Sequence, residues 1–152
     1  MRRLVLCALC ALVCASAAQA MTDGGPGLAF QWPAQGTVTS PYGNDAGRWH
    51  PGVDIGILES LDVVAAAPGI VVAVGEPAGF LGYGEIVQVD VGAGLTTLYA
   101  HLSQPRVEVG DRVWTGELLG IAGCTGICTG THLHFELRQD GVAIDPTPLL
   151  PR

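Results

Sequence analysis

The four histidines of the chain lie in short polar motifs whose residue types could do chemistry together. His50 and Asp54 are four residues apart in the segment His-Pro-Gly-Val-Asp. His101 follows Tyr-Ala, and His132 and His134 stand two residues apart. Imidazole nitrogens and carboxylate oxygens are ligands of Zn²⁺ in proteins, and an imidazole also exchanges protons near neutral pH. The motifs therefore indicate a metal site or an acid–base pair.

The segment around the paired histidines has the period of a β-strand. Side chains two residues apart share one face of a strand, so His132, His134 and Glu136 should project together, while the apolar side chains between them enter the core. Alone, this pattern is also typical of an exposed polar face, and a single histidine such as His101 is usually a surface or core residue. In combination, His, Asp and His leave one tetrahedral position open for water, which is the arrangement of catalytic zinc sites.

Taken together, the motifs resemble the signature blocks of the lysostaphin/LytM-type zinc metallopeptidases. The blocks are His50–Asp54, Tyr99–Ser103 and Gly123–Glu136, and their order and intervals match those of the family. The similarity extends from about Trp32 to Pro151. This resemblance implies a compact, all-β fold of two antiparallel sheets and the hydrolysis of peptide bonds in bacterial cell-wall peptidoglycan.

Carried over to this chain, the resemblance implies one Zn²⁺ bound by His50, Asp54 and His134. It also implies two catalytic histidines that do not bind the metal, His101 and His132. Spacing alone does not distinguish His132 from His134 as the ligand. In such a site zinc lowers the pKa of its water to about 7 and polarises the scissile carbonyl. One imidazole then takes the water proton and the other hydrogen-bonds the oxyanion, with His132 preferred as the base.

Short apolar runs separated by turn residues predict the elements that position these motifs. Each run is bounded by Gly, Pro or Asp, and no window of a dozen residues keeps a helical period. The 22 glycines and 10 prolines also interrupt long helices. We predict an all-β fold with at most a short helical turn. The predicted strands are 63–65, 70–74, 86–91, 95–100, 107–109, 118–122 and 133–137.

Composition predicts one folded domain that does not bind nucleic acid. The chain has 152 residues, 49% of them hydrophobic and 14% charged, which is unlike a disordered chain. Seven arginines and no lysine stand against 14 acidic residues, and the net charge of −7 repels a phosphate backbone. The absence of lysine also excludes a biotinyl or lipoyl carrier domain, whose hairpin the segment near Asp111 resembles.

The first twenty residues are predicted to be a secretory signal peptide. A basic start precedes an apolar run at 4–15, and Ala18-Gln19-Ala20 offers small residues for cleavage, so the mature chain would begin at Met21. The apolar run is shorter than the roughly 20 residues of a membrane span, and no other stretch is long enough to span a membrane. A lipoprotein is the less favoured alternative, because Leu or Val precedes Cys10 and Cys14.

Cys124 and Cys128 are predicted to form a disulfide. They would be the two cysteines of the mature chain, in an oxidising compartment where cysteines pair by default. Their Cα atoms can come within roughly 5–6 Å only if the loop between them turns sharply. The alternative is two free thiols. Relatives usually carry small hydroxyl residues at these positions, and Pro where this chain has Thr131.

The expected organisation is a signal peptide at 1–20, a flexible lead-in at 21–31 and a zinc peptidase domain at 32–152. The favoured function is an exported zinc endopeptidase acting on peptidoglycan in the periplasm or cell envelope, with full secretion as an alternative. The second hypothesis is a non-catalytic regulator with the same fold that binds peptidoglycan and activates other wall hydrolases. A ligand set accompanied by two further histidines favours the enzyme.

Overall fold

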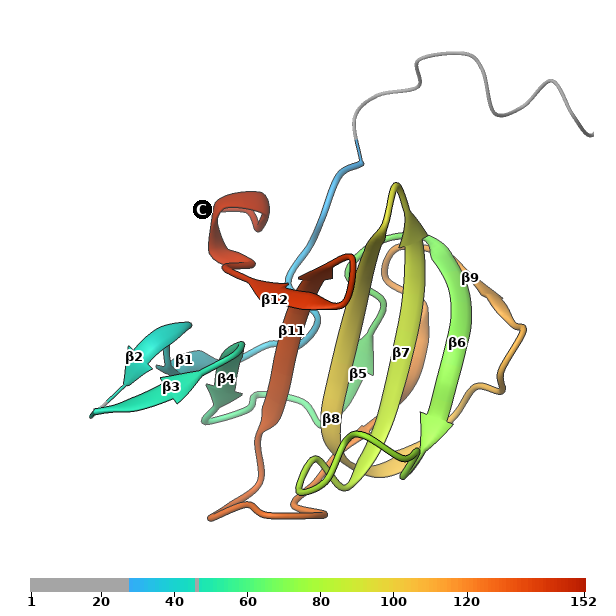
Figure 1. Ribbon diagram of the computed structural model, residues 1–152. Coiled ribbons are helices and arrows are strands. Elements are labelled where there is room, and N and C mark those ends of the chain that lie inside the picture. Colours follow the sequence, from blue (N-terminus) through green and yellow to red (C-terminus); the bar gives the residue numbers. More distant parts are fainter. Residues whose placement is uncertain (1–27, 46) are drawn as a thin grey trace, which may run out of the picture.

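The part of the chain described by the computed structural model, residues 28–45 and 47–152, folds almost entirely into antiparallel β-strands (Figure 1). The predicted signal peptide and most of the predicted lead-in, residues 1–27, lie outside the described residues. The elements are β1 (Thr37–Ser40), β2 (Gly43–Asp45), β3 (Arg48–His50), β4 (Val53–Gly56), β5 (Asp62–Val64), β6 (Gly69–Gly75), β7 (Glu85–Gly92), β8 (Leu95–Pro105), β9 (Arg112–Val113), β10 (Leu118–Ala122), β11 (Leu133–Gln139), β12 (Val142–Ile144) and the 3-10 turn η1 (Thr147–Leu149). The predicted all-β fold is confirmed.

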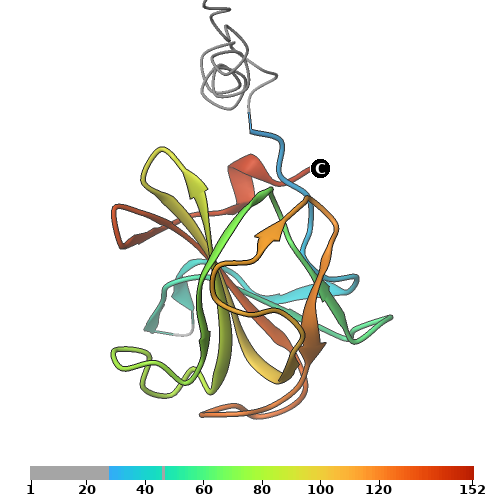
Figure 2. The same cartoon turned by 90° about the vertical axis from the view of Figure 1, so that its right-hand side faces the viewer.

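The strands form one large curled sheet and one small hairpin. The ten-stranded sheet has the order β1-β4-β11-β8-β7-β6-β9, in which β10 also pairs with β8 and β5, and β12 pairs with β11. The strands β2 and β3 form the separate two-stranded sheet. Figures 1 and 2 show that the large sheet curls, so that β5 lies behind the long strands β7 and β8, while β9 lies at the edge beside β6. This curl closes the sheet around its own core.

The two faces of the central strands β8 and β11 have different roles. On one face, Tyr99 lies opposite Phe135 in register, their ring centroids are 5.4 Å apart, and both are buried in the main core. Leu133 and Leu137 are buried there as well, as the alternation predicts. The other face of these strands carries the polar side chains of the candidate site. The alternation of side chains along these strands therefore places core residues on one face and the polar residues of the candidate site on the other.

Tyr99 carries a polar group into the core and satisfies a buried backbone donor. Its hydroxyl oxygen accepts a hydrogen bond of 2.8 Å from the backbone N–H of Ala66, and both residues are fully buried. Burial raises the pKa of Tyr99 to about 12, so the hydroxyl stays protonated. The hydroxyl thus ties the segment after β5 to the centre of the sheet.

Tyr99→Phe is expected to lower the free energy of unfolding by about 1–3 kcal/mol, because the Ala66 N–H would remain buried without an acceptor. Urea unfolding followed by circular dichroism measures this change. The control is Tyr42→Phe, because the Tyr42 hydroxyl donates to the carbonyl oxygen of Ala143 at 3.1 Å in a site only partly buried. Equal losses of unfolding free energy in Tyr99→Phe and Tyr42→Phe would contradict the role given to the Tyr99 hydroxyl.

The structure corrects one predicted strand and adds several. The prediction at 107–109 is wrong: a turn occupies 108–111, closed by the side chain of Asp111, which accepts from the N–H of Glu108. The strand follows as β9. The strands β1 to β4 and β12 were not predicted, because they are short. The packed domain also begins before Trp32, since Phe30 is buried and the N–H of Gln31 donates to the carbonyl of Ala66.

Within the described residues, no helix has both the length and the apolar character needed to cross a membrane.

Candidate active site

The candidate site is built on the register of β11 with its two neighbours. His134 of β11 lies opposite Asp54 of β4 on one side and opposite Ala100 of β8 on the other. Paired residues of antiparallel strands project from the same face of the sheet. Asp54 and His134 therefore point the same way, and Asp54 Oδ1 lies 2.8 Å from His134 Nδ1.

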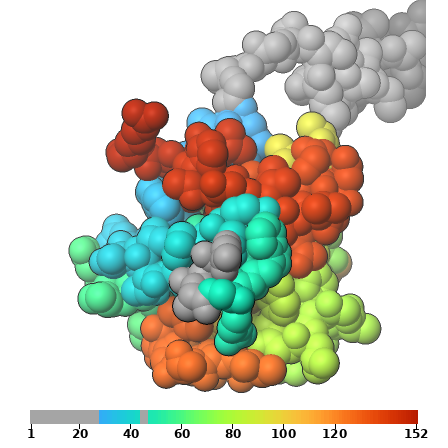
Figure 3. All heavy atoms as spheres, turned by 60° about the vertical axis from the view of Figure 1, so that its left-hand side comes forward, coloured from blue at the N-terminus to red at the C-terminus, as the bar shows by residue number. Residues whose placement is uncertain are grey.

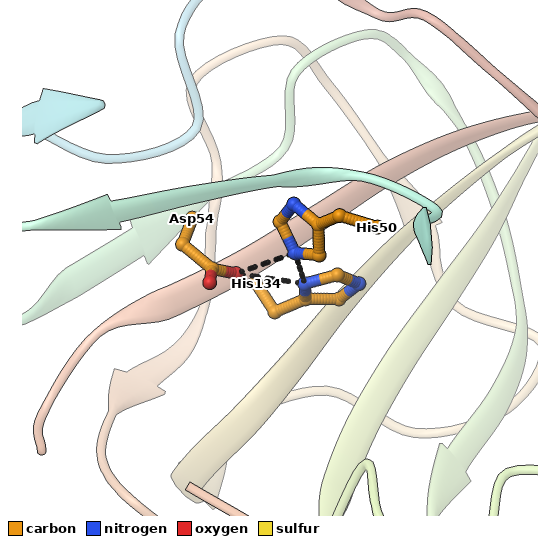
Figure 4. Close-up of side chains that lie close together, drawn as sticks. All are labelled: His50, Asp54 and His134. Atoms are coloured by element: carbon orange, nitrogen blue, oxygen red, sulfur yellow. Dashed lines mark hydrogen bonds and ion pairs between the residues drawn. The ribbon is translucent and has the colours of Figure 1, made fainter. Parts of the chain in front are cut away.

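His50 reaches the same point from the end of β3, just before β4. Any side chain at Gly52 would clash with the carbonyl oxygen of Phe135, so glycine lets this connection lie against β11. His50 Nε2 lies 3.2 Å from Asp54 Oδ1 and 3.1 Å from His134 Nδ1 (Figure 4). The structure thus brings together His50, Asp54 and His134, whose ligand atoms all lie within 4.8 Å of one another.

Hydrogen bonds outside this trio decide which nitrogen each imidazole presents. His50 Nδ1 lies 2.8 Å from the carbonyl oxygen of Pro41, so it carries the proton and Nε2 keeps a lone pair. His134 Nε2 lies 2.9 Å from a carboxylate oxygen of Glu136, so its proton is there and Nδ1 keeps the lone pair. Together with Asp54, three acceptor atoms then face one another. A cation between them would satisfy all three, so this donor set fits a metal ion.

The electrostatics of the trio favour positive charge at its centre. Burial alone would raise the pKa of Asp54, but the hydrogen bond to His134 and the charges of the surrounding histidines hold it below its ordinary value. Burial alone would lower the pKa of His134, but its hydrogen bonds to Asp54 and Glu136 hold it above its ordinary value, so without a metal a proton on Nδ1 takes the place of the cation beside Asp54. The site therefore keeps a carboxylate ionised and attracts a cation.

His101 joins the site because β8 bulges at this position. Regular alternation would turn its side chain to the core face, where Tyr99 lies. Its φ of 61° instead lies in the left-handed region, which non-glycine residues rarely adopt, and the pairing of β8 with β7 shifts register here. The ring centroid of His101 consequently lies 4.8 Å from that of His132 and 5.9 Å from that of His134.

Backbone carbonyls orient the two histidines outside the trio in the same way. His101 Nδ1 lies 2.8 Å from the carbonyl oxygen of Thr125, and His132 Nδ1 lies 2.8 Å from that of Gly130. Each ring therefore keeps a lone pair on Nε2. His132 Nε2 is 3.7 Å from Asp54 Oδ1, so both histidines of the His-x-His segment reach the same carboxylate and share a face, as predicted. Burial lowers the pKa of His101 more than its hydrogen bond to Thr125 raises it, which favours the neutral ring.

A disulfide closes the loop that holds His101. Cys124 and Cys128 are bonded, with Cα atoms 5.5 Å apart, which confirms the predicted pair. Between them, Thr125 Oγ1 donates to a backbone carbonyl of β8 and accepts from a backbone N–H of β7. Gly84 and Gly126 have positive φ, and their backbones approach so closely that a Cβ atom on either would clash with the other segment. The loop is therefore fixed to both strands.

The oxidised mature protein is expected to contain no thiol that can be alkylated. Reduction should lower the free energy of unfolding by at most about 2–3 kcal/mol, because the ring that the disulfide closes is small. Intact-mass analysis after alkylation checks the first expectation, and urea unfolding with and without reductant checks the second. In the urea experiment, Cys124→Ser/Cys128→Ser should be insensitive to reductant. Two reactive thiols in protein matured in an oxidising compartment would contradict the pairing.

The five histidine and aspartate side chains lie in an open groove with a volume of about 390 Å³. Its walls come from the β2–β3 hairpin, the segment 81–83 and the segment 127–132, which adjoin on one face of the molecule in Figure 3. Its rim carries exposed apolar side chains, since Trp49, Leu81 and Ile127 expose 68%, 98% and 82% of their surface. A peptide chain could therefore reach the histidines from solvent.

Sequence reasoning missed several residues around the site. Arg48 and Trp49 line the groove next to a recognised motif. Glu136 was placed on the correct face without a role, although it is fully buried, and Arg138 Nε donates to it at 2.6 Å. Extending the period of two by one further step would have placed Arg138 on the same face. Tyr83 also donates to Glu136, at 2.6 Å, but it comes from a distant loop with no local signal.

Comparison with known proteins identifies the family. A family model described as peptidase family M23 matches residues 48–146, a range that includes every residue of the trio and both further histidines. The chain belongs to peptidase family M23. This result confirms the lysostaphin-type resemblance, and the catalytic domain of the antimicrobial peptidase lysostaphin from Staphylococcus simulans superposes with a TM-score of 0.61. That match has 33% identity and covers 74% of this chain and 88% of the lysostaphin domain.

Two further similar proteins bear on function. A zinc containing peptidase from Vibrio cholerae superposes with a TM-score of 0.66 at 26% identity, covering 77% of this chain and 39% of that one. The murein hydrolase activator EnvC of Escherichia coli is 37% identical over 130 residues, which are 83% of this chain and 30% of EnvC. The chain spans less than half the length of the curated relatives that it matches. The proteins that this chain resembles thus include some named as peptidases and some named as activators.

Proposed function

We propose that this M23 protein is an exported zinc metalloendopeptidase that hydrolyses peptide bonds of bacterial cell-wall peptidoglycan. The convergence of His50 Nε2, Asp54 Oδ1 and His134 Nδ1 in an open groove carries the proposal. The lysostaphin domain and the zinc containing peptidase support hydrolysis and the metal. The word murein in the name of EnvC supports the wall as the site of action. The predicted signal peptide supports export to the periplasm or cell envelope.

The trio would hold the metal. Two imidazole nitrogens and one carboxylate oxygen are the donor types that Zn²⁺ takes in catalytic sites. When bound, zinc supplies a Lewis acid that activates a water and polarises the scissile carbonyl. The hydrogen bonds of His50 to Pro41 and of His134 to Glu136 keep the ligand nitrogens unprotonated and aimed at the centre.

His101 and His132 would act on the protons of the reaction. Each keeps a free lone pair on Nε2, because a backbone carbonyl holds the proton on Nδ1. One of them would take the water proton on Nε2, and the other would donate from Nε2 to the oxyanion of the scissile carbonyl when its ring carries a proton on both nitrogens. The lowered pKa of His101 favours the neutral ring, which suits it to accept the proton. This division reverses the preference for His132 as the base that we drew from the sequence.

The groove suits a peptide that belongs to a polymer. It is open to solvent, and its rim is apolar, so an extended peptide can lie along Trp49, Leu81 and Ile127 with its carbonyl over the trio. The net charge of −7 gives no long-range attraction to an anionic wall. Recognition would therefore depend on short-range contacts inside the groove.

The alternative function is a non-catalytic regulator that binds peptidoglycan and activates other wall hydrolases. The likeness to EnvC, which is named as an activator, favours this alternative. The arrangement of the trio beside two oriented histidines favours catalysis, because binding to the wall requires neither a cation site nor two imidazoles with free lone pairs.

Release of new amino termini from purified peptidoglycan tests the proposal. The zinc-loaded mature protein is expected to release free amines from at least one cross-link type, and the metal-stripped protein is expected to release none. Adding zinc back should restore release. A wild-type protein that binds the wall but releases no amines from any cross-link type, and that activates another wall hydrolase equally well with or without metal, would establish the regulator instead.

A further inference from the structure

The buried carboxylate of Glu136 has more hydrogen-bond partners than packing alone requires. We propose that Glu136, clamped by Tyr83 and Arg138, is a positioning residue that selects the tautomer of His134 and so prepares the metal site. The inference rests on the proposed function only in naming zinc as the metal. Its readouts are metal affinity and the tautomer of one histidine, so it can be judged apart from hydrolysis.

Three donors converge on the Glu136 carboxylate. Oε1 accepts from the Tyr83 hydroxyl at 2.6 Å and from His134 Nε2 at 2.9 Å, and Oε2 accepts from Arg138 Nε at 2.6 Å. Glu136 is fully buried. A buried carboxylate is costly unless its partners satisfy it, and the positive charge of Arg138 and two further donors do so here. Donors therefore surround both carboxylate oxygens, and Oε1 faces His134 Nε2 as an acceptor.

Aromatic rings hold the clamp in place. The guanidinium carbon of Arg138 lies 5.1 Å from the centroid of the Phe80 ring, and Phe80 meets Tyr83 edge to face with centroids 5.7 Å apart. The Tyr83 ring in turn lies edge to face with His134, at 5.5 Å between centroids. Neither donor can leave Glu136 without disturbing this packing, so the position of the carboxylate is strongly determined.

The consequence falls on the other nitrogen of His134. With its proton fixed on Nε2, the ring presents a lone pair on Nδ1, and Nδ1 is the atom that faces Asp54 Oδ1 at 2.8 Å and His50 Nε2 at 3.1 Å. The opposite tautomer would place an N–H between these atoms and oppose a cation. Groups that orient a metal-bound histidine in this way typically contribute about 10- to 100-fold to metal affinity.

Tyr83 also connects the clamp to the second half of the site. Its backbone carbonyl accepts from the N–H of His101 at 2.9 Å, while its hydroxyl donates to Glu136. The same residue therefore supports both the bulge that turns His101 into the groove and the carboxylate that orients His134.

Glu136→Gln tests the proposal with little change of shape. The charged Arg138 favours the amide oxygen at the position of Oε2, which leaves the amide NH₂ at the position of Oε1. There it would donate to the Tyr83 hydroxyl oxygen and to His134 Nε2, so the neutral His134 ring would carry its proton on Nδ1. Competition with a chromogenic chelator is expected to show zinc affinity about 10- to 100-fold weaker than in wild type. Nitrogen-15 spectra of the zinc-free protein at mildly alkaline pH are expected to show the His134 proton on Nε2 in wild type and on Nδ1 in the variant.

Two further variants separate positioning from folding. Tyr83→Phe keeps the carboxylate and removes one donor, so zinc affinity should fall severalfold, less than in Glu136→Gln. This variant also serves if Glu136→Gln does not fold, and unchanged zinc affinity in it would then contradict the clamp. Leu98 is a buried residue of β8 that pairs with Glu136 of β11. Leu98→Val should lower the stability of the fold without changing zinc affinity. The proposal is overturned if Glu136→Gln keeps wild-type affinity and tautomer, or if Leu98→Val weakens zinc binding equally. A protein that binds zinc as described but hydrolyses nothing would overturn the proposed function alone.

Discussion

His50→Ala is expected to lose its bound zinc and its peptide-bond hydrolysis together, while the fold is retained. His50 Nε2 is one of three atoms that converge on the metal position, and the ring lies at the end of β3 rather than in the core. Removing it leaves two ligands, fewer than the three protein ligands of catalytic zinc sites. Elemental analysis of the purified mature protein should find about one zinc per chain in wild type and none in the variant.

The matched control is His132→Ala. His132 Nε2 lies 3.7 Å from Asp54 Oδ1, next to the trio but outside it. This variant should keep full zinc occupancy and still lose activity. Complete loss of zinc from both His50→Ala and His132→Ala would contradict the choice of His134 over His132 as the ligand. Circular dichroism verifies that each variant is folded.

His101→Ala is expected to keep the fold and the zinc. Its rate of peptide-bond hydrolysis should fall by about a hundredfold or more, since positioned acid–base or oxyanion groups contribute on this scale. Initial rates of amine release at saturating peptidoglycan, with zinc content determined on the same samples, measure the effect.

The control for His101→Ala is Gln104→Ala. Gln104 lies on the same strand, β8, and its side chain is exposed. It should have wild-type rate and wild-type zinc. If His101→Ala hydrolyses peptidoglycan as fast as Gln104→Ala does, then the lone pair that Thr125 leaves on His101 Nε2 has no part in the reaction.

Local patterns in the sequence predicted part of the geometry around the candidate site. The alternation at 132–137 predicted both the buried face of β11 and the shared direction of His132 and His134, because a strand allows few alternatives. The two cysteines left in the predicted mature chain predicted the disulfide, because the oxidising compartment inferred from the signal peptide favours pairing. The short strands beside these motifs, such as β4, offer too few residues for a period to appear. Even so, β4 supplies Asp54.

Other parts of the site depend on contacts that no local pattern contains. Alternation along β8 would place His101 in the core, and a bulge with positive φ places it in the groove instead. The hydrogen bond from Tyr83 to Glu136 joins two residues that are 53 positions apart in the sequence. The groove walls come from the β2–β3 hairpin and two loops, whose positions depend on tertiary packing. Sequence patterns thus identify the reactive groups, and the fold determines how they are held.

Incorporation of heavy oxygen from labelled water into peptidoglycan fragments tests the central claim most directly. If the M23 protein hydrolyses a peptide bond, mass spectrometry should find one labelled oxygen in the new carboxyl group of each product, paired with a new amino terminus. The label should appear with zinc-loaded wild type and be absent with His50→Ala or after removal of the metal. Unlabelled, uncleaved peptidoglycan from every cross-link type after incubation with zinc-loaded wild type would contradict the enzymatic account.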